Sequence, residues 1–224
     1  MIKIENTDVF GWDSAIRGMR NPMNSWDKSD SHWDLRSDKI EAEWFYLVGE
    51  NDLNLMKKLS KAGNDHAKYL RMINVTCDIT APLYWYKEYD TYKVGTVANS
   101  CSTMHKITSK PIELSDFSID NVYFDDDYNE ISLEDMFDNV VSNCEDLRLK
   151  YLETKDKRYW RGLIQLLPSS YNQKRTVQLN YQVLKNMYFS RRHHKLDEWK
   201  EFCSWCESLP YFKEICIQED NSNE

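Results

Sequence analysis

Glycine, proline and long apolar runs are scarce in this sequence. Its 224 residues include only 6 Gly and 5 Pro, whereas a turn-dense all-β sandwich or barrel depends on many such residues. No stretch approaches the roughly 20 apolar residues that a membrane-spanning helix requires, and Met1 to Asp8 carries no signal-peptide core. We therefore expect a cytoplasmic protein of long helices and a few strands, with no membrane partner.

Positive charge is also in short supply. Lys and Arg number 29 against 37 Asp and Glu, for a net charge of −8 at pH 7. We therefore do not expect such a chain to bind duplex nucleic acid through a broad positive face, although the charge balance still allows a local basic pocket. The six cysteines are spread along a chain with no secretory signal, which favours free thiols over a disulfide framework.

Apolar and aromatic residues are plentiful. Hydrophobic residues make up 41% and aromatic residues 13% of the chain, enough to bury one sizeable core. The sequence shows neither an internal repeat nor a long linker, so we predict a single domain over residues 1–224.

Periodicity and capping signals predict the elements of the first half. We expect strands at Met1–Glu5 and Met72–Ile79 and helical segments at Phe10–Met19, Asp38–Val48, Asn51–Gly63 and from Pro82 onward, with a loop at Asn24–Asp38.

The second half is expected to be mostly helical. The acidic stretch Ser109–Glu130, with its Asp125-Asp126-Asp127 triplet, is interpreted as a solvated connection rather than a metal site, because a cation needs convergent oxygens. Ser132 and Asp135 resemble a capping box. The helix that they begin has a predicted buried stripe of Met136, Val140, Cys144, Leu147 and Tyr151, and further helices are expected at Lys157–Leu167, Lys174–Ser190 and Leu196–Leu209.

The most unusual segment runs from Tyr84 to Lys106. Aromatic rings precede a Gly95-centred turn, and a dense set of small polar side chains follows from Asn99 to Thr103. Rings can stack on a planar heterocycle, while hydroxyls and the ammonium groups of Lys93 and Lys106 can hold phosphate oxygens, as a nucleotide-like ligand would need. The alternative is that the aromatics are core and the Ser/Thr cluster is a turn with helix caps.

A second cluster, Arg191-Arg192-His193-His194-Lys195, follows the expected Lys174–Ser190 helix. Cations are favoured near a helix C-terminus, so these residues can simply be a solvated helix end. Four of the five can also contact an anion. His193 and His194 could join Cys203 and Cys206 in a zinc or redox site, but the apolar rhythm around Phe202 and Trp205 favours cysteines on a packing face.

Common nucleophile and phosphate motifs are missing. The sequence has no Walker-type loop, no G-x-S-x-G elbow and no H-E-x-x-H pair. Cys101, with His105 four residues on, is a conceivable nucleophile, and a structural or ligand-lining cysteine is the alternative.

Two collinear blocks of the chain resemble the flavin-dependent thymidylate synthases, also called thymidylate synthase complementing proteins. In that family a strand and a Pro-containing helix precede a motif of the form R-H-R-x-x-S-x-N-E-x-S-x-R-Y, and Ile79 to Lys106 resembles this block with the same spacing. The family then has a helix ending in Leu-Pro and a longer helix with flavin-contacting asparagines and a substrate-contacting arginine. Leu167-Pro168 followed by Asn180, Asn186 and Arg191 match that pattern.

The motif itself departs from the family. The Arg-His-Arg positions fall on Thr91, Tyr92 and Lys93, the first serine on Thr96, the Asn-Glu pair on Ala98 and Asn99, and the later Ser and Arg-Tyr positions on Cys101, Thr103 and Met104. The arginine expected on the Leu-Pro helix falls on Ile164. Lysine and hydroxyl groups supply fewer and less oriented hydrogen bonds than guanidinium groups, so affinity for ordinary deoxyuridylate should fall.

The resemblance implies an α/β (α+β) fold with a small mixed or antiparallel sheet flanked by long helices, and a homotetramer. It implies FAD and a pyrimidine nucleotide, dUMP or a related one, with NADPH as reductant and methylenetetrahydrofolate as one-carbon donor. Its family positions give Arg191 as catalytic; Tyr92, Lys93, Asn180, Asn186 and His194 as cofactor-binding; and Glu88, Thr96, Asn99, Ser100, Cys101, Ser102, Thr103 and Arg191 as substrate-binding.

The resemblance to the family and the replaced motif residues leave two possible functions. The first is a thymidylate synthase-like enzyme, altered towards another pyrimidine substrate. The second is a catalytically inactive or repurposed relative that serves as a nucleotide-binding or assembly module. The replaced motif stays polar and organised, from Thr91 to Thr103, which favours a changed ligand over decay.

Overall fold

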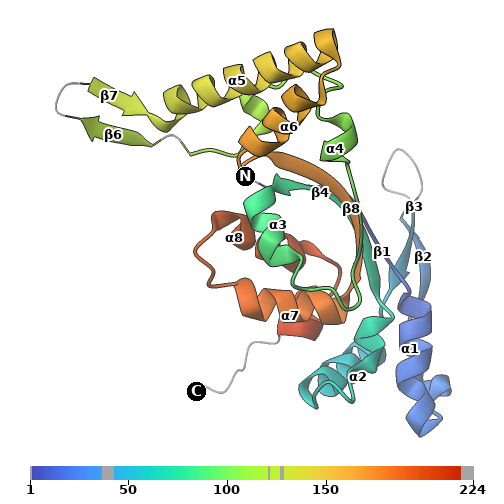
Figure 1. Cartoon of the computed structure of the whole chain (residues 1–224). Helices are drawn as coiled ribbons and strands as arrows, with labels where there is room; N and C mark the ends of the chain where they lie inside the picture. Colours follow the sequence, from blue (N-terminus) through green and yellow to red (C-terminus); the bar gives the residue numbers. More distant parts are fainter. Residues whose placement is uncertain (1, 37–42, 121, 127–128, 218–224) are drawn as a thin grey trace. The chain divides into compact units, whose positions relative to one another are not determined.

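The computed structural model describes residues 2–36, 43–120, 122–126 and 129–217 (Figure 1). Within them, no helix has both the length and the apolar character needed to cross a membrane. The chain forms two compact units, one from the described residues of 1–5, 78–91 and 98–176 and the other from those of 6–77, 92–97 and 177–224. A single domain over the whole chain stays a prediction.

One sheet of four strands has the order β1-β4-β8-β5. Its strands are β1 (Lys3–Phe10), β4 (Asn74–Pro82), β8 (Asn172–Asn180) and β5 (Val97–Ser100). In β4, buried residues alternate with partly exposed ones from Asn74 to Ala81, which is the period of two that a strand imposes. The predicted mixture of helices with a small sheet is confirmed.

The first unit is built around a helical hairpin. It contains α3 (Leu83–Tyr89), α4 (Thr103–Lys106), the 3-10 turn η4 (Leu114–Asp116), the antiparallel pair β6 (Tyr123–Asp126) and β7 (Asn129–Ser132), α5 (Leu133–Thr154) and α6 (Lys157–Leu166).

The predicted capping box at the start of α5 is confirmed. The Asp135 amide donates to the Ser132 hydroxyl at 3.0 Å, and the Asp135 carboxylate accepts from the Ser132 amide at 3.2 Å. Two helix N–H groups that would otherwise lack partners are thereby satisfied. The helix ends at Thr154, the following Lys155 has a left-handed φ of 58°, and the Asp156 carboxylate then caps α6.

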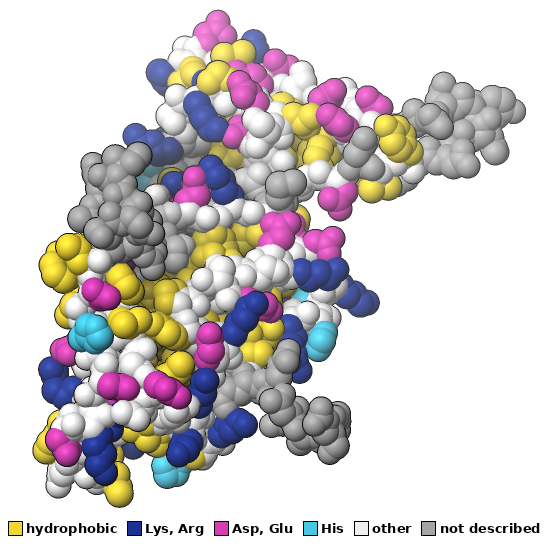
Figure 2. Space-filling view, turned by 180° about the vertical axis from the view of Figure 1, so that it is seen from behind, with side chains coloured by type: hydrophobic (Ala, Val, Ile, Leu, Met, Phe, Trp, Pro, Cys, Tyr) yellow, Lys and Arg dark blue, Asp and Glu magenta, His cyan; other side chains and the backbone are white. Residues whose placement is uncertain are grey.

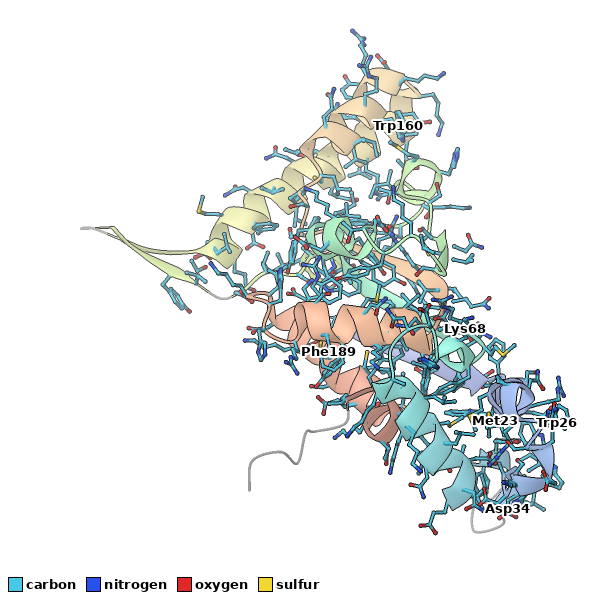
Figure 3. The ribbon with its side chains drawn as sticks, turned by 90° about the horizontal axis from the view of Figure 1, so that it is seen from below. Met23, Trp26, Asp34, Lys68, Trp160 and Phe189 are labelled. Atoms are coloured by element: carbon cyan, nitrogen blue, oxygen red, sulfur yellow. The ribbon has the colours of Figure 1, made fainter. Side chains whose placement is uncertain are left out.

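The hairpin core of this unit gathers Cys144 of α5 and Leu163 of α6 with Ile107, Ile112 and Phe117. Trp160 of α6, labelled in Figure 3, packs against this core. Of the predicted buried stripe on α5, Cys144 is fully buried but Met136 is 52% exposed. The prediction for Met136 is therefore wrong, because Phe137, the next residue, is the one that packs against the core.

The second unit contains α1 (Trp12–Arg20), the 3-10 turns η1 (Asn21–Met23), η2 (Trp26–Lys28) and η3 (Lys68–Arg71), the antiparallel pair β2 (His32–Arg36) and β3 (Glu43–Leu47), α2 (Glu50–Lys61), α7 (Tyr181–Arg191), α8 (Asp197–Ser208) and the π-helical turn η5 (Lys213–Ile217).

A buried ion pair fixes the start of this unit. The Arg20 Nε donates to the Asp52 carboxylate at 2.6 Å, and the hydroxyls of Ser29 and Ser31 each donate to the other carboxylate oxygen at 2.7 Å. Burial alone would raise the pKa of Asp52, but these hydrogen bonds and the guanidinium charge outweigh it and hold the pKa below its ordinary value.

Four predictions of secondary structure are wrong in part. The expected helix Lys174–Ser190 is the end of β8 followed by α7. In the strand part, buried Val177 and Leu179 alternate with exposed Thr176 and Gln178. This period of two continues up to the cap at Asn180.

The other three involve strands that form only by pairing. A helix is expected at Asp38–Val48, but 43–47 pairs with β2, while 38–42 lies outside the described residues. The expected loop Asn24–Asp38 contains η2 and β2, and Ser109–Glu130 contains η4 and β6. Asp127 lies outside the described residues.

Candidate functional site

Arg191 is surrounded by aromatic side chains in the second unit. Its Nε donates to the Tyr92 hydroxyl at 3.0 Å. Its guanidinium carbon lies 5.1 Å from the Trp199 ring centre and 5.5 Å from that of Tyr92, within the range of a cation–π contact. The His194 ring lies 6.3 Å from that of Trp199. We call Arg191, Tyr92, Trp199 and His194 the Arg191 cluster.

The local sequence explains how this cluster forms. Arg191 ends α7 and Trp199 lies in the first turn of α8, so the intervening turn brings the two side chains together. The His194 amide donates to the Arg191 carbonyl at 2.8 Å, and the His194 ring accepts from the Leu196 amide at 3.2 Å. The predicted cofactor residues Tyr92 and His194 and the predicted catalytic Arg191 therefore gather at one place.

Asn180 and Asn186 lie at the start and middle of α7. The Asn180 carboxamide oxygen accepts from the Val183 amide at 3.1 Å and caps the helix. Asn186 is exposed, and its carboxamide oxygen accepts from Gln182 at 3.1 Å. Gly95 has a φ of 78°, and a Cβ there would lie 3.1 Å from Val183 and 3.2 Å from the Asn180 amide nitrogen. The predicted turn at Gly95 therefore requires glycine beside Asn180.

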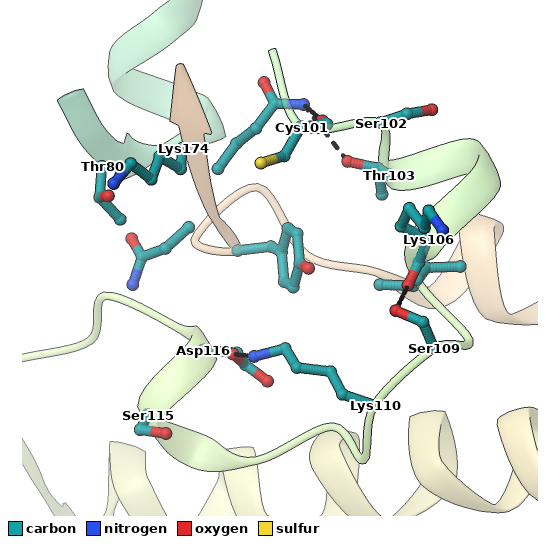
Figure 4. Close-up of a pocket in the computed structure, with 14 residues that line it drawn as sticks. Thr80, Cys101, Ser102, Thr103, Lys106, Ser109, Lys110, Ser115, Asp116 and Lys174 are labelled. Carbon is teal, nitrogen blue, oxygen red and sulfur yellow. Dashed lines mark hydrogen bonds and ion pairs between the residues drawn. The ribbon is translucent and has the colours of Figure 1, made fainter. Parts of the chain in front are cut away.

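A cavity of about 360 Å³ lies in the first unit (Figure 4). We call it the lysine-lined cavity. Its lining residues are Thr80, Cys101, Ser102, Thr103, Lys106, Ile107, Ser109, Lys110, Ser115, Asp116, Tyr171, Asn172, Gln173 and Lys174. Figure 4 shows Thr80 and Lys174 on one side of it and Lys106 and Ser109 on the other. Of the predicted substrate residues, the cavity brings together Cys101, Ser102 and Thr103.

A network of polar side chains joins strand β8 to the segment 101–103 that lines this cavity. Gln173 donates to the Cys101 carbonyl at 2.9 Å and to the Thr103 hydroxyl at 3.3 Å. Arg175 donates to the Gln173 carboxamide oxygen at 2.9 Å and to the Asp90 carboxylate at 2.7 Å. The Arg175 guanidinium also lies 3.7 Å from the Tyr86 ring centre. Strand β8 thus positions the segment from 101 to 103.

The three cavity lysines differ in their partners. Lys110 pairs with Asp116, and Lys174 pairs with Asp78 at 3.0 Å. These hydrogen bonds raise the pKa of both ammonium groups above the ordinary value. Among the described residues, no carboxylate pairs with Lys106. The cavity therefore offers one ammonium group that has no counter-charge within the described part of the chain.

Other predicted site residues lie outside both clusters. Glu88 lies on α3, where its backbone carbonyl accepts from the Thr91 hydroxyl. Asn99 and Ser100 are exposed on β5, and Lys93 is exposed after Tyr92. The hydroxyl of Thr96 is buried and has no hydrogen-bond partner among the described residues.

Sequence reasoning missed Lys110, Tyr171, Gln173 and Lys174 as cavity residues. The last three lie at the start of β8 or just before it, about 70 residues after Thr103. A strand pattern at 172–179 is the one signal that could have indicated them.

Both alternatives for the aromatic block and the cysteines can now be compared with the structure. Trp85, Tyr86 and Tyr89 are buried core residues, and the Ser102 hydroxyl caps α4, so the packing interpretation holds for them.

Cys203 and Cys206 are also buried, and burial raises the pKa of the Cys203 thiol to about 11. Among the described residues, no three His, Cys, Asp or Glu side chains are grouped as a metal site requires.

Charged side chains of both signs are mixed on the face seen in Figure 2, where Lys and Arg alternate with Asp and Glu. On this face the basic side chains have acidic neighbours, whereas three lysines gather around the lysine-lined cavity.

Solved structures share this fold. Thymidylate synthase X (ThyX) from Helicobacter pylori, in a crystal structure with FAD and dUMP, matches with a TM-score of 0.67 at 16% identity, over 97% of this chain and 98% of that chain. The UMP/dUMP methylase PolB from Streptomyces cacaoi, bound with 5-Br UMP, matches with a TM-score of 0.58 at 15% identity, over 96% and 93%. No protein-family model and no curated protein matches the sequence. The likeness shows that the chain has the fold of these enzymes.

Proposed function

We propose that this chain is a distant relative of the flavin-dependent thymidylate synthases that binds FAD and a pyrimidine nucleotide for reductive methylation. The observation that carries the proposal is the shared fold over 97% of the chain. The H. pylori structure holds FAD and dUMP, and the S. cacaoi enzyme is a UMP/dUMP methylase. The residues of the Arg191 cluster support it, because a cation framed by rings suits an anionic, planar ligand.

The residues present fit a flavin. The buried Thr96 hydroxyl has no hydrogen-bond partner among the described residues and lies in the sequence next to Gly95, where an added Cβ would come within 3.2 Å of the Asn180 carboxamide nitrogen. Carboxamides, hydroxyls and rings are the groups that the polar edge and flat face of a flavin can use. We assign Tyr92, Lys93, Asn180, Asn186 and His194 to hold FAD. When bound and reduced, a flavin supplies a hydride.

Arg191 and the motif residues are assigned to the nucleotide. Arg191 would contact the substrate as its catalytic residue and orient an anionic group by its fixed fork of donors. Cys101, Ser102 and Thr103 line the lysine-lined cavity, and we extend the substrate set to Glu88, Thr96, Asn99 and Ser100. NADPH, methylenetetrahydrofolate, a homotetramer and a cytoplasmic location follow from the resemblance and belong to the same proposal.

The second candidate is a relative without catalysis that keeps nucleotide binding or assembly. It is favoured by Thr91, Tyr92 and Lys93 where the family has Arg-His-Arg. It is also favoured by the hydrogen bond from Arg191 to Tyr92, which already occupies one donor of the guanidinium.

An absorbance spectrum of concentrated, freshly purified protein separates the two. Bound oxidised flavin with its two visible and near-ultraviolet bands, bleached by a reductant and followed by methylation of dUMP or UMP, supports the enzyme. A colourless protein that neither binds added FAD nor gains thermal stability from a pyrimidine nucleotide rejects the enzyme. Flavin binding without turnover on any pyrimidine nucleotide favours the second candidate.

A further inference from the structure

We infer that two copies of this chain associate through an aromatic face of the β2–β3 hairpin in the second unit. The antiparallel register pairs Trp33 with Tyr46 and Leu35 with Trp44. Cross-strand partners share a face of a sheet, and so do residues two apart along one strand. These four side chains therefore form one face, which we call the tryptophan face. The inference concerns this face alone and does not rest on FAD or nucleotide binding.

The tryptophan face is covered at one end and open at the other. The Trp33 ring lies 5.2 Å from the Tyr46 ring in an edge-to-face contact. Partial burial and the carboxylates of Asp13 and Asp52 raise the pKa of Tyr46, so its hydroxyl lies near α1 and the start of α2. Trp33 and Trp44, in contrast, are 59% and 65% exposed. The hairpin lies on the right in Figure 1, and hydrophobic side chains gather on the corresponding left side of Figure 2, which is turned by 180°.

The hairpin has no other strand to cover it. Among the described residues, β2 and β3 form a sheet of two strands with no third strand beside them. A two-stranded hairpin is marginally stable in water by itself and gains stability when a face is packed. A two-fold contact between copies covers the same face on both of them and then closes, because no further copy of the face is left open.

Charge favours a second copy as the occupant of this face. None of the four side chains of the tryptophan face is charged, although the chain carries a net charge of −8. Two copies with the same net charge repel each other least where no charges meet. A neutral face also lacks the charges by which a basic or acidic partner of another sequence would be selected.

The exposed area fits a small homodimer interface. A large aromatic side chain buries about 150–250 Å², so the exposed parts of Trp33 and Trp44 amount to roughly 300 Å². Two copies would bring together roughly 600 Å² of such surface. Homodimer interfaces are about 65% apolar, and a specific interface covers at least about 1,000 Å² in total. The two rings of each copy therefore supply most of the apolar area that a weak dimer needs.

A small hollow near the tryptophan face suits a side chain of a second copy. Asp13 lines this hollow and also acts on Tyr46, so the hollow lies near the covered end of the face. Its volume of about 170 Å³ is below the range of about 300 to 1,000 Å³ for small-molecule sites. Arg and Trp are the residue types enriched at the centres of protein interfaces. The hollow is lined by Asp13, Ile16, Arg17, Arg20, Trp26 and Ser29.

Sedimentation velocity over a range of protein concentrations measures this association. We expect the wild type to form a dimer or a larger even-numbered oligomer. Trp44→Ser should raise the dissociation constant of the contact at least about tenfold, because interface tryptophans carry much of the binding energy. Leu35→Lys places like charges on both copies of the face and should weaken the contact to a similar extent. The matched control is Tyr123→Ser, which removes a 61% exposed aromatic side chain from β6 of the other hairpin and should leave association unchanged.

Circular dichroism spectra show whether each variant folds, and Leu35→Lys decides the question if Trp44→Ser does not. A wild type that stays monomeric overturns the inference and leaves the face to a partner of another sequence. An equal loss of association in Tyr123→Ser also overturns it. If an oligomer of the wild type persists unchanged in the folded variants, this inference fails and the homotetramer of the proposed function stands. FAD binding is measured separately by the absorbance spectrum, so its failure is distinguishable from the failure of this contact.

Discussion

The Arg191 cluster and the lysine-lined cavity use positive charge in different ways. In the second unit Arg191 donates to the Tyr92 hydroxyl and lies against the Trp199 ring, so its orientation is fixed before any ligand arrives. In the first unit Lys106 borders the lysine-lined cavity and has no carboxylate partner among the described residues. Its ammonium group is carried by a flexible aliphatic side chain. A guanidinium framed by rings favours one geometry, whereas an ammonium adapts to several.

On the proposed function, the fold is shared with the solved enzymes while the residues at its motif positions differ. The motif positions where the family has arginines are Thr91, Lys93 and Thr103 here. Lys106, Lys110 and Lys174 border the cavity that includes Thr103. The positive charge that Thr91 and Thr103 do not supply is present nearby in the three lysines that border the cavity.

The largest expected effect concerns the buried ion pair of Arg20 and Asp52. Asp52→Asn leaves the Arg20 guanidinium without its counter-charge, and removing one partner of a buried pair costs about 3–5 kcal/mol. Urea unfolding at neutral pH measures this loss. The isosteric asparagine keeps the packing, so an unchanged free energy of unfolding would show that the pair contributes nothing.

The same residue predicts a pH dependence. Because the folded state lowers the pKa of Asp52, its stabilisation is present above the unfolded pKa of about 3.9 and is lost as pH falls through the folded pKa. The free energy of unfolding of the wild type should therefore fall below about pH 4 more steeply than that of Asp52→Asn. Parallel curves would contradict this assignment.

The second effect tests whether geometry matters at Arg191. Arg191→Lys keeps the charge but loses the fork that donates to Tyr92, so nucleotide affinity should fall about tenfold or more. Arg192→Lys is the matched control, because Arg192 is exposed and adjacent in sequence. Calorimetric titration with dUMP or UMP measures both variants. Equal nucleotide affinities of Arg191→Lys and Arg192→Lys would show that the fixed geometry of the Arg191 guanidinium does not matter for binding.

The third effect sharpens the role of the Gly95 turn. Gly95→Ala places a Cβ in a left-handed conformation and within 3.2 Å of the Asn180 amide nitrogen, so we expect a loss of about 1–2 kcal/mol of stability. Gly63→Ala has a similar backbone but no atom within 4 Å of the added Cβ. A larger loss at Gly95 than at Gly63 would measure the crowding against Asn180, and equal losses would exclude it.

The smallest effect belongs to a partly exposed lysine. Asp78 raises the pKa of Lys174, so the stability that the pair adds is present at neutral pH and lost as pH rises through that raised value, above about 10.4. Both side chains are partly exposed, so Lys174→Gln should change thermal stability only slightly, and less at high salt. A large loss that salt does not reduce would show that the Lys174 pair resembles the buried Arg20 pair.

Local signals predicted the elements that depend on neighbouring residues. Ser132 with Asp135 indicated the start of α5, and Pro168 indicated the end of α6, because caps and prolines act within one turn. The strands β2, β3 and β8 were missed in whole or in part, since their hydrogen-bond partners lie elsewhere in the chain. The spacing of apolar residues favoured helix for Asp38–Val48 and Lys174–Ser190.

In the candidate site, too, residues close together in sequence were predicted and residues from distant segments were missed. Cys101, Ser102 and Thr103 were indicated by their composition, and the structure places them around one cavity. Tyr92, His194 and Arg191 were indicated by the resemblance and gather through Trp199, which sequence reasoning did not include. Gln173 and Lys174 reach the cavity only because β8 lies beside the segment from 101, where the Cys101 amide donates to the Lys174 carbonyl at 2.9 Å.

The helical hairpin of α5 and α6 has a consequence for the order of folding. Its two helices follow each other directly, each with its own cap, and pack through Cys144 and Leu163. Contacts between neighbours in sequence form quickly, whereas the Asp78–Thr176 hydrogen bond joins residues 98 positions apart and must wait for a long loop to close. The hairpin can therefore form before β8 pairs with β4, and the cavity, which needs residues of β8, is among the last features to be assembled.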